Sequence, residues 1–255
     1  MRAYDDLGHR VDLDGPPRRV VSLVPSLTEA LAVTCPEVLV GATDWCTHPP
    51  ALAVPRVRGT KNPDRRAIAA LQPDLVVANK EENRELDVRR LREAGVRVWV
   101  TDAESVPQAL DALERLFRLL DCGAPSWLHD ARSLWGGPVP APRARVAVPI
   151  WRDPWMVVGA RTFTGDVVRR MGLANVFAHH TDRYPKVPLA DIDRADIDLV
   201  LLPDEPYVFT ADDGPEAFQR TRTLLVSGRL LTWYGPSLVE AHRELSAAVD
   251  AALPG

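Results

Sequence analysis

Short apolar runs alternate with amphipathic stretches along most of this chain. The run from Arg19 to Pro25 is rich in β-branched residues and ends at a proline, which is typical of a buried parallel strand. Ser26 and Glu29 follow with the spacing of a capping box, so we expect a helix from about Leu27 to Val33. A second short strand is expected over Val38–Gly41.

The same alternation continues as far as Asp102. Strands that alternate with helices of this length predict a parallel sheet that is covered on both faces. The expected elements are a helix over Asp64–Leu71, a strand over Asp74–Ala78, a helix over Glu85–Ala94 and a strand over Val96–Val100.

A helical region with a Gly/Pro-rich end separates the two halves of the chain. Ser105–Leu120 has apolar residues at three- and four-residue steps, which predicts an amphipathic helix that stops at Cys122 and Gly123. Ser126–Trp135 predicts a second, shorter helix, and the glycines and prolines of 136–143 mark a boundary.

Alternation restarts after this boundary. The expected elements are strands over Arg145–Ile150, Ile197–Leu202 and Leu230–Trp233 and helices over Thr164–Met171 and Ser237–Leu253. The sequence therefore predicts an α/β fold of two Rossmann-like lobes with central parallel sheets, joined by a helical linker. The predicted parts are an N-terminal lobe over 1–104, the linker region over 105–143 and a C-terminal lobe over 144–255.

Composition narrows the class of partner. The 255 residues are 46% hydrophobic, enough for two cored lobes, and carry a net charge of −4, which disfavours nucleic acid and anionic membrane surfaces. No stretch has the pattern of a secretory signal or a membrane span, so no membrane insertion is expected. As written, the protein is expected in the cytoplasm, and outside it if the true start lies upstream. Three cysteines are too few for a disulfide framework, and Cys35 lies too far along the chain to be an N-terminal lipid attachment site.

Four segments carry a resemblance to a known family. They are 19–29, which opens the first lobe; 40–50, a loop after the second strand; 71–79, with its Pro-Asp-Leu-Val junction; and 163–177, with its Gly-x-x-Asn-Val-Phe exit. Together they resemble the Fe³⁺-siderophore and vitamin B12 (cobalamin) substrate-binding family, whose members are helical-backbone metal receptors of the class III periplasmic-binding-protein type. The resemblance implies a non-enzymatic protein that captures a metal chelate or corrinoid in an interlobe cleft for an ABC importer permease. The alternative is a cytoplasmic ligand sensor or carrier on the same scaffold.

Two departures from the family pattern bear on these implications. The helix that usually displays a permease-docking carboxylate begins here with Asp64-Arg65-Arg66, so the matching position is basic and coupling to an importer is in doubt. Where corrinoid binders are expected to carry tryptophan after the second and third strands, this chain has Thr60 and Asn79, which favours a smaller, more polar ligand.

Ligands of open α/β sheets bind beyond the carboxyl ends of the strands, so residues just after each strand are the candidate ligand contacts. Aromatic rings there could stack on a ligand or pack between lobes, and the cations could orient an anionic edge or face solvent. Trp99 and Trp127 are expected in the core. The candidate ligand-binding residues are Trp45, Lys61, Asn79, Lys80, Trp151, Arg152, Trp155, Glu205, Tyr207 and Trp233.

Neither metal-binding nor catalytic motifs are evident in the sequence. His48, His179 and His180 do not have the arrangement expected of a bare-metal receptor, so no protein-bound metal and no required cofactor is predicted. The chain lacks a nucleophile elbow, a phosphate-binding P-loop, a dinucleotide fingerprint and a His-Glu-x-x-His motif, and we therefore predict no catalytic residues.

Overall fold

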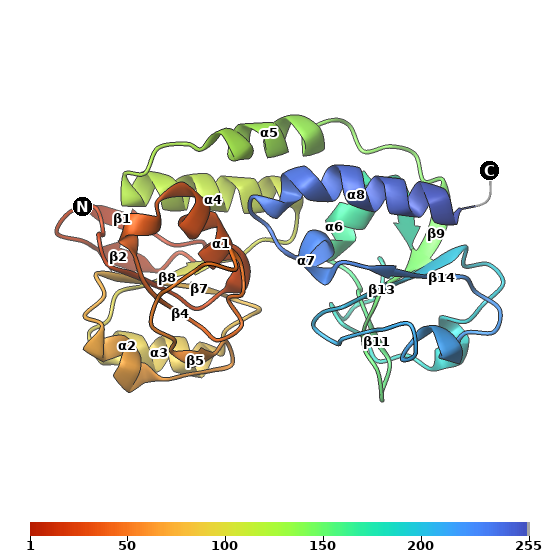
Figure 1. Ribbon diagram of the computed structural model, residues 1–255, viewed down its shortest axis with the longest axis horizontal. Coiled ribbons are helices and arrows are strands. Elements are labelled where there is room, and N and C mark those ends of the chain that lie inside the picture. Colours follow the sequence, from red (N-terminus) through yellow and green to blue (C-terminus); the bar gives the residue numbers. More distant parts are fainter. Residues whose placement is uncertain (254–255) are drawn as a thin grey trace. The chain divides into compact units, whose positions relative to one another are not determined.

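The computed structural model describes residues 1–253, and the chain divides into two compact units. Unit 1 comprises Met1–Asp102, Gln108–His129 and Tyr234–Pro236, and unit 2 comprises Ala103–Pro107, Asp130–Trp233 and the chain from Ser237 onward. Figure 1 shows the elements of both units along the chain. The boundaries at 104 and 143 stay a prediction.

Unit 1 is built on a four-stranded parallel sheet of order β4-β3-β7-β8. Its elements are β1 (Arg2–Tyr4), β2 (Arg10–Asp12), β3 (Val20–Ser22), α1 (Pro25–Thr34), η1 (Pro36–Val38), β4 (Leu39–Ala42), β5 (Arg58–Gly59), β6 (Asn62–Pro63), α2 (Arg65–Ala70), β7 (Leu75–Asn79), α3 (Glu85–Glu93) and β8 (Val98–Thr101).

The sheet of unit 1 is buried on both faces, as continuous apolar strands require. Every residue of β3, β7 and β8 is buried, including Trp99. Figure 1 shows α2 and α3 on one side of this sheet and α1 on the other. The core on the α2/α3 side comprises Val21, Leu23, Val57, Ile68, Val76, Ala78, Val88, Leu91, Val98 and Val100.

Unit 2 has a second four-stranded parallel sheet, of order β12-β9-β13-β14. Its elements are β9 (Ala144–Ala147), β10 (Pro149–Trp151), β11 (Met156–Val157), α6 (Phe163–Arg170), β12 (Leu173–Asn175), η2 (Leu189–Asp191), β13 (Leu199–Pro203), η3 (Pro215–Ala217), β14 (Thr223–Val226), α7 (Gly228–Thr232) and α8 (Ser237–Ala252).

Loops with aromatic side chains cover part of the unit 2 sheet. The Trp155 ring stacks on Phe209, with 5.9 Å between ring centroids, and meets Phe218 edge-on at 5.4 Å. These rings pack with Ala147, Val200 and Leu202 of the sheet. Large planar side chains supply here the buried area that helices supply elsewhere.

Helix α4 (Val106–Leu120) contributes residues to both units, and so does α5 (Ser126–Trp135). Near the start of α4, the Val106 amide donates to the buried Asp166 carboxylate at 2.9 Å. Further along, Arg115 of α4 donates to the Asp6 carboxylate at 2.7 Å. The predicted linker helices over Ser105–Leu120 and Ser126–Trp135 are therefore confirmed to within one residue.

The predicted capping box at Ser26 and Glu29 is wrong. Helix α1 begins at Pro25, and its N-cap residue Val24 makes no side-chain capping bond. Ser26 and Glu29 are both buried in the helix. Proline is favoured at the first helical position because it has no N–H that would be left without a hydrogen-bond partner there. The helix therefore starts at Pro25 without a capping box.

The expected strand over Leu230–Trp233 is also wrong, because this segment forms helix α7. The Ser227 hydroxyl accepts from the Leu230 amide at 3.4 Å and so caps the helix, while the fourth strand, β14, lies earlier at Thr223–Val226. Periodicity alone cannot separate a short apolar helix from a buried strand. The fold class itself, two parallel α/β sheets with helices, is confirmed.

Asp166 provides a test of how α4 is anchored to unit 2. Burial alone would raise the pKa of this carboxyl, but hydrogen bonds from Arg170, Arg169 and the Val106 amide outweigh burial and lower it below its usual value. We expect Asp166→Asn to reduce the free energy of unfolding at neutral pH by about 2 kcal/mol, because the largely buried Arg170 guanidinium loses its carboxylate. Urea unfolding measures this loss.

The pH dependence of that loss follows from the direction of the pKa shift. Because the folded pKa of Asp166 is depressed, its stabilisation is present above the unfolded value of about 3.9 and disappears as the pH falls through the folded pKa. The difference between wild type and Asp166→Asn should therefore shrink in acid. Asp250→Asn, which removes an exposed partner of Arg143, is the control with little expected change. If the difference in unfolding free energy between wild type and Asp166→Asn were the same at all pH values, the stabilising role of the ionised Asp166 carboxylate would be contradicted.

Candidate functional site

The carboxyl edge of the unit 1 sheet is organised by Asn79, the last residue of β7. Its buried side-chain amide donates to the Thr101 carbonyl at 3.1 Å and to the Tyr234 hydroxyl at 2.7 Å. Its side-chain oxygen accepts from the Glu81 amide at 2.8 Å and the Glu82 amide at 3.2 Å. Asn79 therefore shapes the loop that follows β7, and its role as a ligand contact stays a prediction.

Tyr234 reaches this edge from the far end of the sequence, within the short segment of unit 1 that comprises Tyr234–Pro236. Its hydroxyl lies 3.0 Å from Thr101 Oγ1, and burial raises its pKa above the usual value. Trp233, the predicted ligand contact next to it, is buried and belongs to unit 2. No local pattern around Asn79 indicates this long-range hydrogen bond, so sequence reasoning could not find it.

Both predicted cations of unit 1 are engaged within the protein. Lys80 forms an ion pair with Asp102, with 2.7 Å between Nζ and Oδ2. The Lys61 ammonium donates to the Glu81 backbone carbonyl. An anionic ligand would have to compete with these partners.

Trp45 is the most exposed tryptophan in the described residues, at 67%, and it lies in the loop that follows β4. Its Nε1 atom lies 3.3 Å from where a Cβ on Gly59 would be, and Asn62 Oδ1 lies 2.5 Å from that point. A side chain at Gly59 would therefore force the Asn62 side chain to move and would press on the indole. Gly59 thus leaves room for both side chains, and the sequence analysis did not identify it.

In unit 2, the residues after β10 and β13 form one cluster around Arg152. The Arg152 guanidinium pairs with Asp213 and Glu216, and it lies over the Trp155 ring at 5.6 Å from the centroid. The Tyr207 hydroxyl donates to Asp213 Oδ2 at 2.6 Å, and the Trp151 and Tyr207 rings meet edge-on at 5.5 Å. Trp151, Arg152 and Tyr207 are thus brought together within unit 2, and their roles as ligand contacts stay predictions.

Electrostatics within this cluster favour the paired state. The Tyr207 hydrogen bond and the Arg152 guanidinium lower the pKa of Asp213, and Arg152 likewise lowers that of Glu216. The two carboxylates raise the pKa of Arg152, with Glu216 the larger influence. One cation therefore faces two carboxylates, and the cluster carries a net negative charge.

Asp213 and Glu216 were missed in the sequence analysis. They follow the end of β13 at some distance, in the run Asp212-Asp213-Gly214-Pro215-Glu216, and nothing local links them to Arg152. The two residues could have been found by searching further along the loop after β13, because ligands of open α/β sheets bind beyond the carboxyl ends of the strands.

The remaining predicted residues of unit 2 differ in accessibility. Trp155 is 8% exposed and belongs to the core, whereas Trp151 is 45% exposed. Glu205 is half-buried after β13, where its Oε1 atom accepts from the Thr232 hydroxyl at 3.4 Å. The ligand-binding roles of all three stay predictions, and accessibility favours Trp151.

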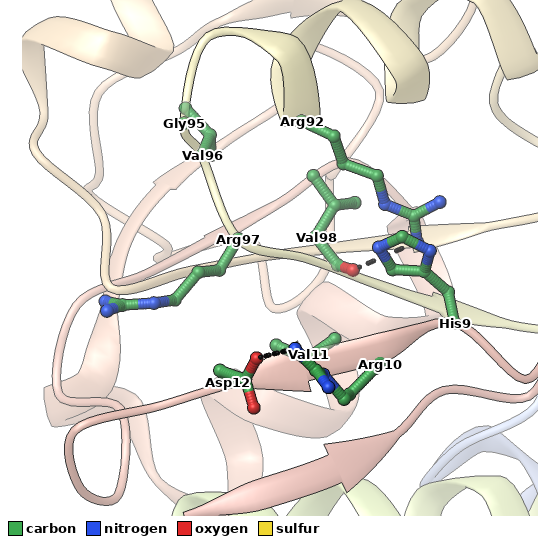
Figure 2. A pocket seen from close by; sticks show the side chains of 9 residues that line it. All are labelled: His9, Arg10, Val11, Asp12, Arg92, Gly95, Val96, Arg97 and Val98. Atoms are coloured by element: carbon green, nitrogen blue, oxygen red, sulfur yellow. Dashed lines mark hydrogen bonds and ion pairs between the residues drawn. The ribbon is translucent and has the colours of Figure 1, made fainter.

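A separate pocket of about 240 Å³ in unit 1 lies at the amino end of β8, away from the carboxyl edge of the sheet (Figure 2). In it, Arg92 pairs with Asp5 at 2.8 Å, and Arg97 pairs with Asp14 at the same distance. Since these cations already have carboxylate partners, the pocket adds nothing to the candidate ligand site. It is lined by His9, Arg10, Val11, Asp12, Arg92, Gly95, Val96, Arg97 and Val98.

Within residues 1–253, no group of three or more His, Cys, Asp or Glu side chains is arranged to hold a metal ion. None of the helices in this range has the length and apolar character needed to cross a membrane.

The hydrogen bond between Tyr207 and Asp213 yields a direct test of the unit 2 cluster. It raises the pKa of Tyr207, because the ionised phenol would face the Asp213 carboxylate without a shared proton. We expect Asp213→Asn to lower the Tyr207 pKa toward its ordinary value, measured by the ultraviolet absorbance of tyrosinate. Asp212→Asn is the matched control, and superimposable titrations of Asp213→Asn and wild type would disprove the bond.

The chain was compared with known protein families and sequences. No protein-family model matches the chain. A vitamin B12-binding protein of Salmonella paratyphi A is 29% identical over 176 residues, which make up 66% of this chain and 66% of the relative. The chain thus spans just under two thirds of the length of the Salmonella vitamin B12-binding proteins that it matches.

Solved structures match over more of the chain. The periplasmic vitamin B12-binding protein of Vibrio cholerae superposes with a TM-score of 0.72 at 19% identity, over 93% of this chain and 98% of that one. A periplasmic heme-binding protein of Pseudomonas aeruginosa superposes with a TM-score of 0.75 at 24% identity, over 93% and 94% of the two chains. The solved structures show the fold, and together with the curated relatives they confirm the resemblance of this chain to the Fe³⁺-siderophore and vitamin B12 substrate-binding family.

Proposed function

We propose that this chain is a non-enzymatic binding protein that captures a corrinoid or metal chelate through the loops at the carboxyl ends of its two sheets. The observation that carries the proposal is the exposure of Trp45, in the loop that follows β4, and of Trp151, the last residue of β10. An accessible indole ring offers a large, rigid face on which a flat ligand can stack. The names of the similar proteins support the same class of ligand.

The charges at these loops favour a ligand that is neutral or cationic and rich in hydrogen-bond donors. Lys80 and Arg152 are already paired with carboxylates, and Asp213 and Glu216 face solvent with about half of their side-chain surface. A porphyrin with two carboxylates would meet like charges at this cluster. The carboxamide groups of a corrinoid would instead donate to carboxylate oxygens. Among the ligand classes of the similar proteins, corrinoids therefore fit better than heme.

Two further features concern the location of the protein and its coupling to an importer. The similar solved proteins are named as periplasmic, which supports the extracytoplasmic alternative over the cytoplasmic one. Arg66 is exposed in the first turn of α2, where an importer-docking carboxylate was expected, and this favours the sensor or carrier role as the second candidate.

Trp45 and Trp151 provide the test of binding. We expect Trp45→Ala or Trp151→Ala to weaken corrinoid binding about tenfold, corresponding to roughly 1.4 kcal/mol of lost ring contact, with little change in melting temperature. Isothermal titration with cyanocobalamin and cobinamide measures the affinities. Tyr4→Ala removes a similarly exposed ring from β1 and is the control that should leave binding intact. Unchanged affinity together with lost stability in Trp151→Ala would assign the ring to packing.

Ligand preference tests the charge argument separately. We expect wild type to bind cobinamide about tenfold more tightly than hemin, and the variant carrying Asp213→Asn and Glu216→Gln to gain hemin affinity because Arg152 is released. Tighter binding of hemin by wild type would overturn the charge argument and leave the binding function standing. Failure of cobinamide, cyanocobalamin, hemin and ferric siderophores alike would overturn the function.

A further inference from the structure

The pocket at the amino end of β8 is lined by more cationic than anionic side chains. One wall is formed by residues 9–12, which include β2, and the other by residues 92–98, which join α3 to β8 (Figure 2). Three arginines line it, Arg10, Arg92 and Arg97, and the carboxylate among its lining residues is Asp12. Its volume of about 240 Å³ is several times the roughly 30 Å³ that a water molecule occupies in the liquid, so the pocket has room for a polyatomic ion.

Arg92 is the cation that the fold holds in place. Its Nη2 atom donates to Asp5 Oδ2 at 2.8 Å and to the Val98 carbonyl at 3.2 Å. The Asp5 carboxylate also accepts from three backbone amides, so Arg92 is one of four donors that share this acceptor. Arg92 Nε is buried and has no hydrogen-bond partner within residues 1–253. Because a buried N–H without an acceptor costs free energy, Arg92 would gain from a further acceptor beside it.

The other two arginines lie at the pocket rim in ion pairs that water reaches. Arg10 meets Asp12 at 2.9 Å, and Arg2 meets the same carboxylate at 3.5 Å, so two guanidinium groups share one anion. Arg97 meets Asp14 at 2.8 Å, and the Asp14 side chain is 94% exposed. Exposed pairs of this kind contribute little, because water screens both charges. A ligand with two negative charges can therefore take the place of these carboxylates.

The chemistry of the lining side chains favours a phosphate group. A guanidinium presents parallel N–H donors that match two oxygens of a phosphate or a carboxylate. Donors on several walls suit a tetrahedral dianion better than a planar monoanion, because tetrahedral oxygens point in several directions at once. The exposed His9 ring adds an N–H donor in either protonation state. The buried residues Val11 and Val98 keep part of the lining apolar, which strengthens the attraction between opposite charges.

We propose that this pocket binds a phosphate dianion, either free or as the end of a small phosphate monoester, among Arg10, Arg92 and Arg97. Arg10 belongs to β2, Arg92 to α3, and Arg97 directly precedes β8. The bound ion therefore joins the β1–β2 hairpin to the edge of the unit 1 sheet. This site is separate from the loops at the carboxyl end of that sheet, and it does not depend on the corrinoid or chelate proposal.

The test is isothermal titration of the whole protein at constant ionic strength with inorganic phosphate, methyl phosphate and acetate. We expect saturable binding of the phosphates and at least about tenfold weaker binding of acetate, which carries one charge. Tighter binding of methyl phosphate assigns the site to a monoester, and tighter binding of inorganic phosphate assigns it to the free ion. Phosphate at ten times its dissociation constant should also raise the melting temperature by about 3–6 °C.

Charge variants locate the binding in this pocket. We expect the double variant Arg10→Gln and Arg97→Gln to bind phosphate at least about tenfold more weakly than wild type. The double variant Arg65→Gln and Arg89→Gln removes the same charge from exposed positions outside the pocket and should bind within about twofold of wild type.

Removal of a competing carboxylate should have the opposite effect. We expect Asp14→Asn to tighten phosphate binding about threefold, because it releases Arg97 from its exposed pair. Asp250→Asn removes an exposed carboxylate of unit 2 and is the control that should leave the affinity unchanged.

Three results would each overturn the proposal: no saturable binding of either phosphate, equal affinity for acetate, or equal weakening in the two arginine double variants. Circular dichroism and the melting temperature without phosphate show whether each variant is folded. Should the Arg10 and Arg97 double variant fail to fold, Asp14→Asn still decides, since unchanged or weaker phosphate binding in that variant would contradict the site.

Discussion

Parallel strands end at a shared edge, and at that edge the sheet stops satisfying backbone hydrogen bonds. In unit 1, buried side-chain amides take over. Asn79 bonds the neighbouring strand at Thr101, the loop amides that follow it, and Tyr234 from the far end of the chain. Asn83 donates to the Leu23 and Thr60 carbonyls. Because an unpaired buried polar group is costly, the loop has little freedom to take another path. The position of Lys80 beside Asp102 depends on this arrangement.

The equivalent edge of unit 2 is organised by charge. Arg152 bridges Asp213 and Glu216, which lie on a different loop, and Tyr207 adds a hydrogen bond to the same cluster. Each partly exposed pair contributes modestly to stability, and a network of several contributes more by holding side chains in one geometry. The positive charge of Arg152 is therefore already neutralised, and the cluster exposes carboxylate oxygens to solvent.

Aromatic residues separate into two roles that their positions after strands do not distinguish. Trp155 lies within the hydrophobic core beside Phe209, and Trp151, four positions earlier, stays exposed against Tyr207. The pairing of β10 with β11 turns the chain between them, so that one ring faces the sheet and the other faces solvent. Burial therefore distinguishes a packing ring from a ring that is available to a ligand.

The amino-acid sequence by itself determined the alternation of strands and helices, the α/β class and the long amphipathic helix, because these depend on local periodicity. It failed at Leu230–Trp233, where a short apolar run fits a helix and a strand equally well and the Ser227 cap decides. Only the tertiary structure decided that Arg152 meets Asp213 and that Asn79 meets Tyr234. Contacts between residues far apart in the chain depend on how the elements pack, and periodicity within one segment carries no information about them.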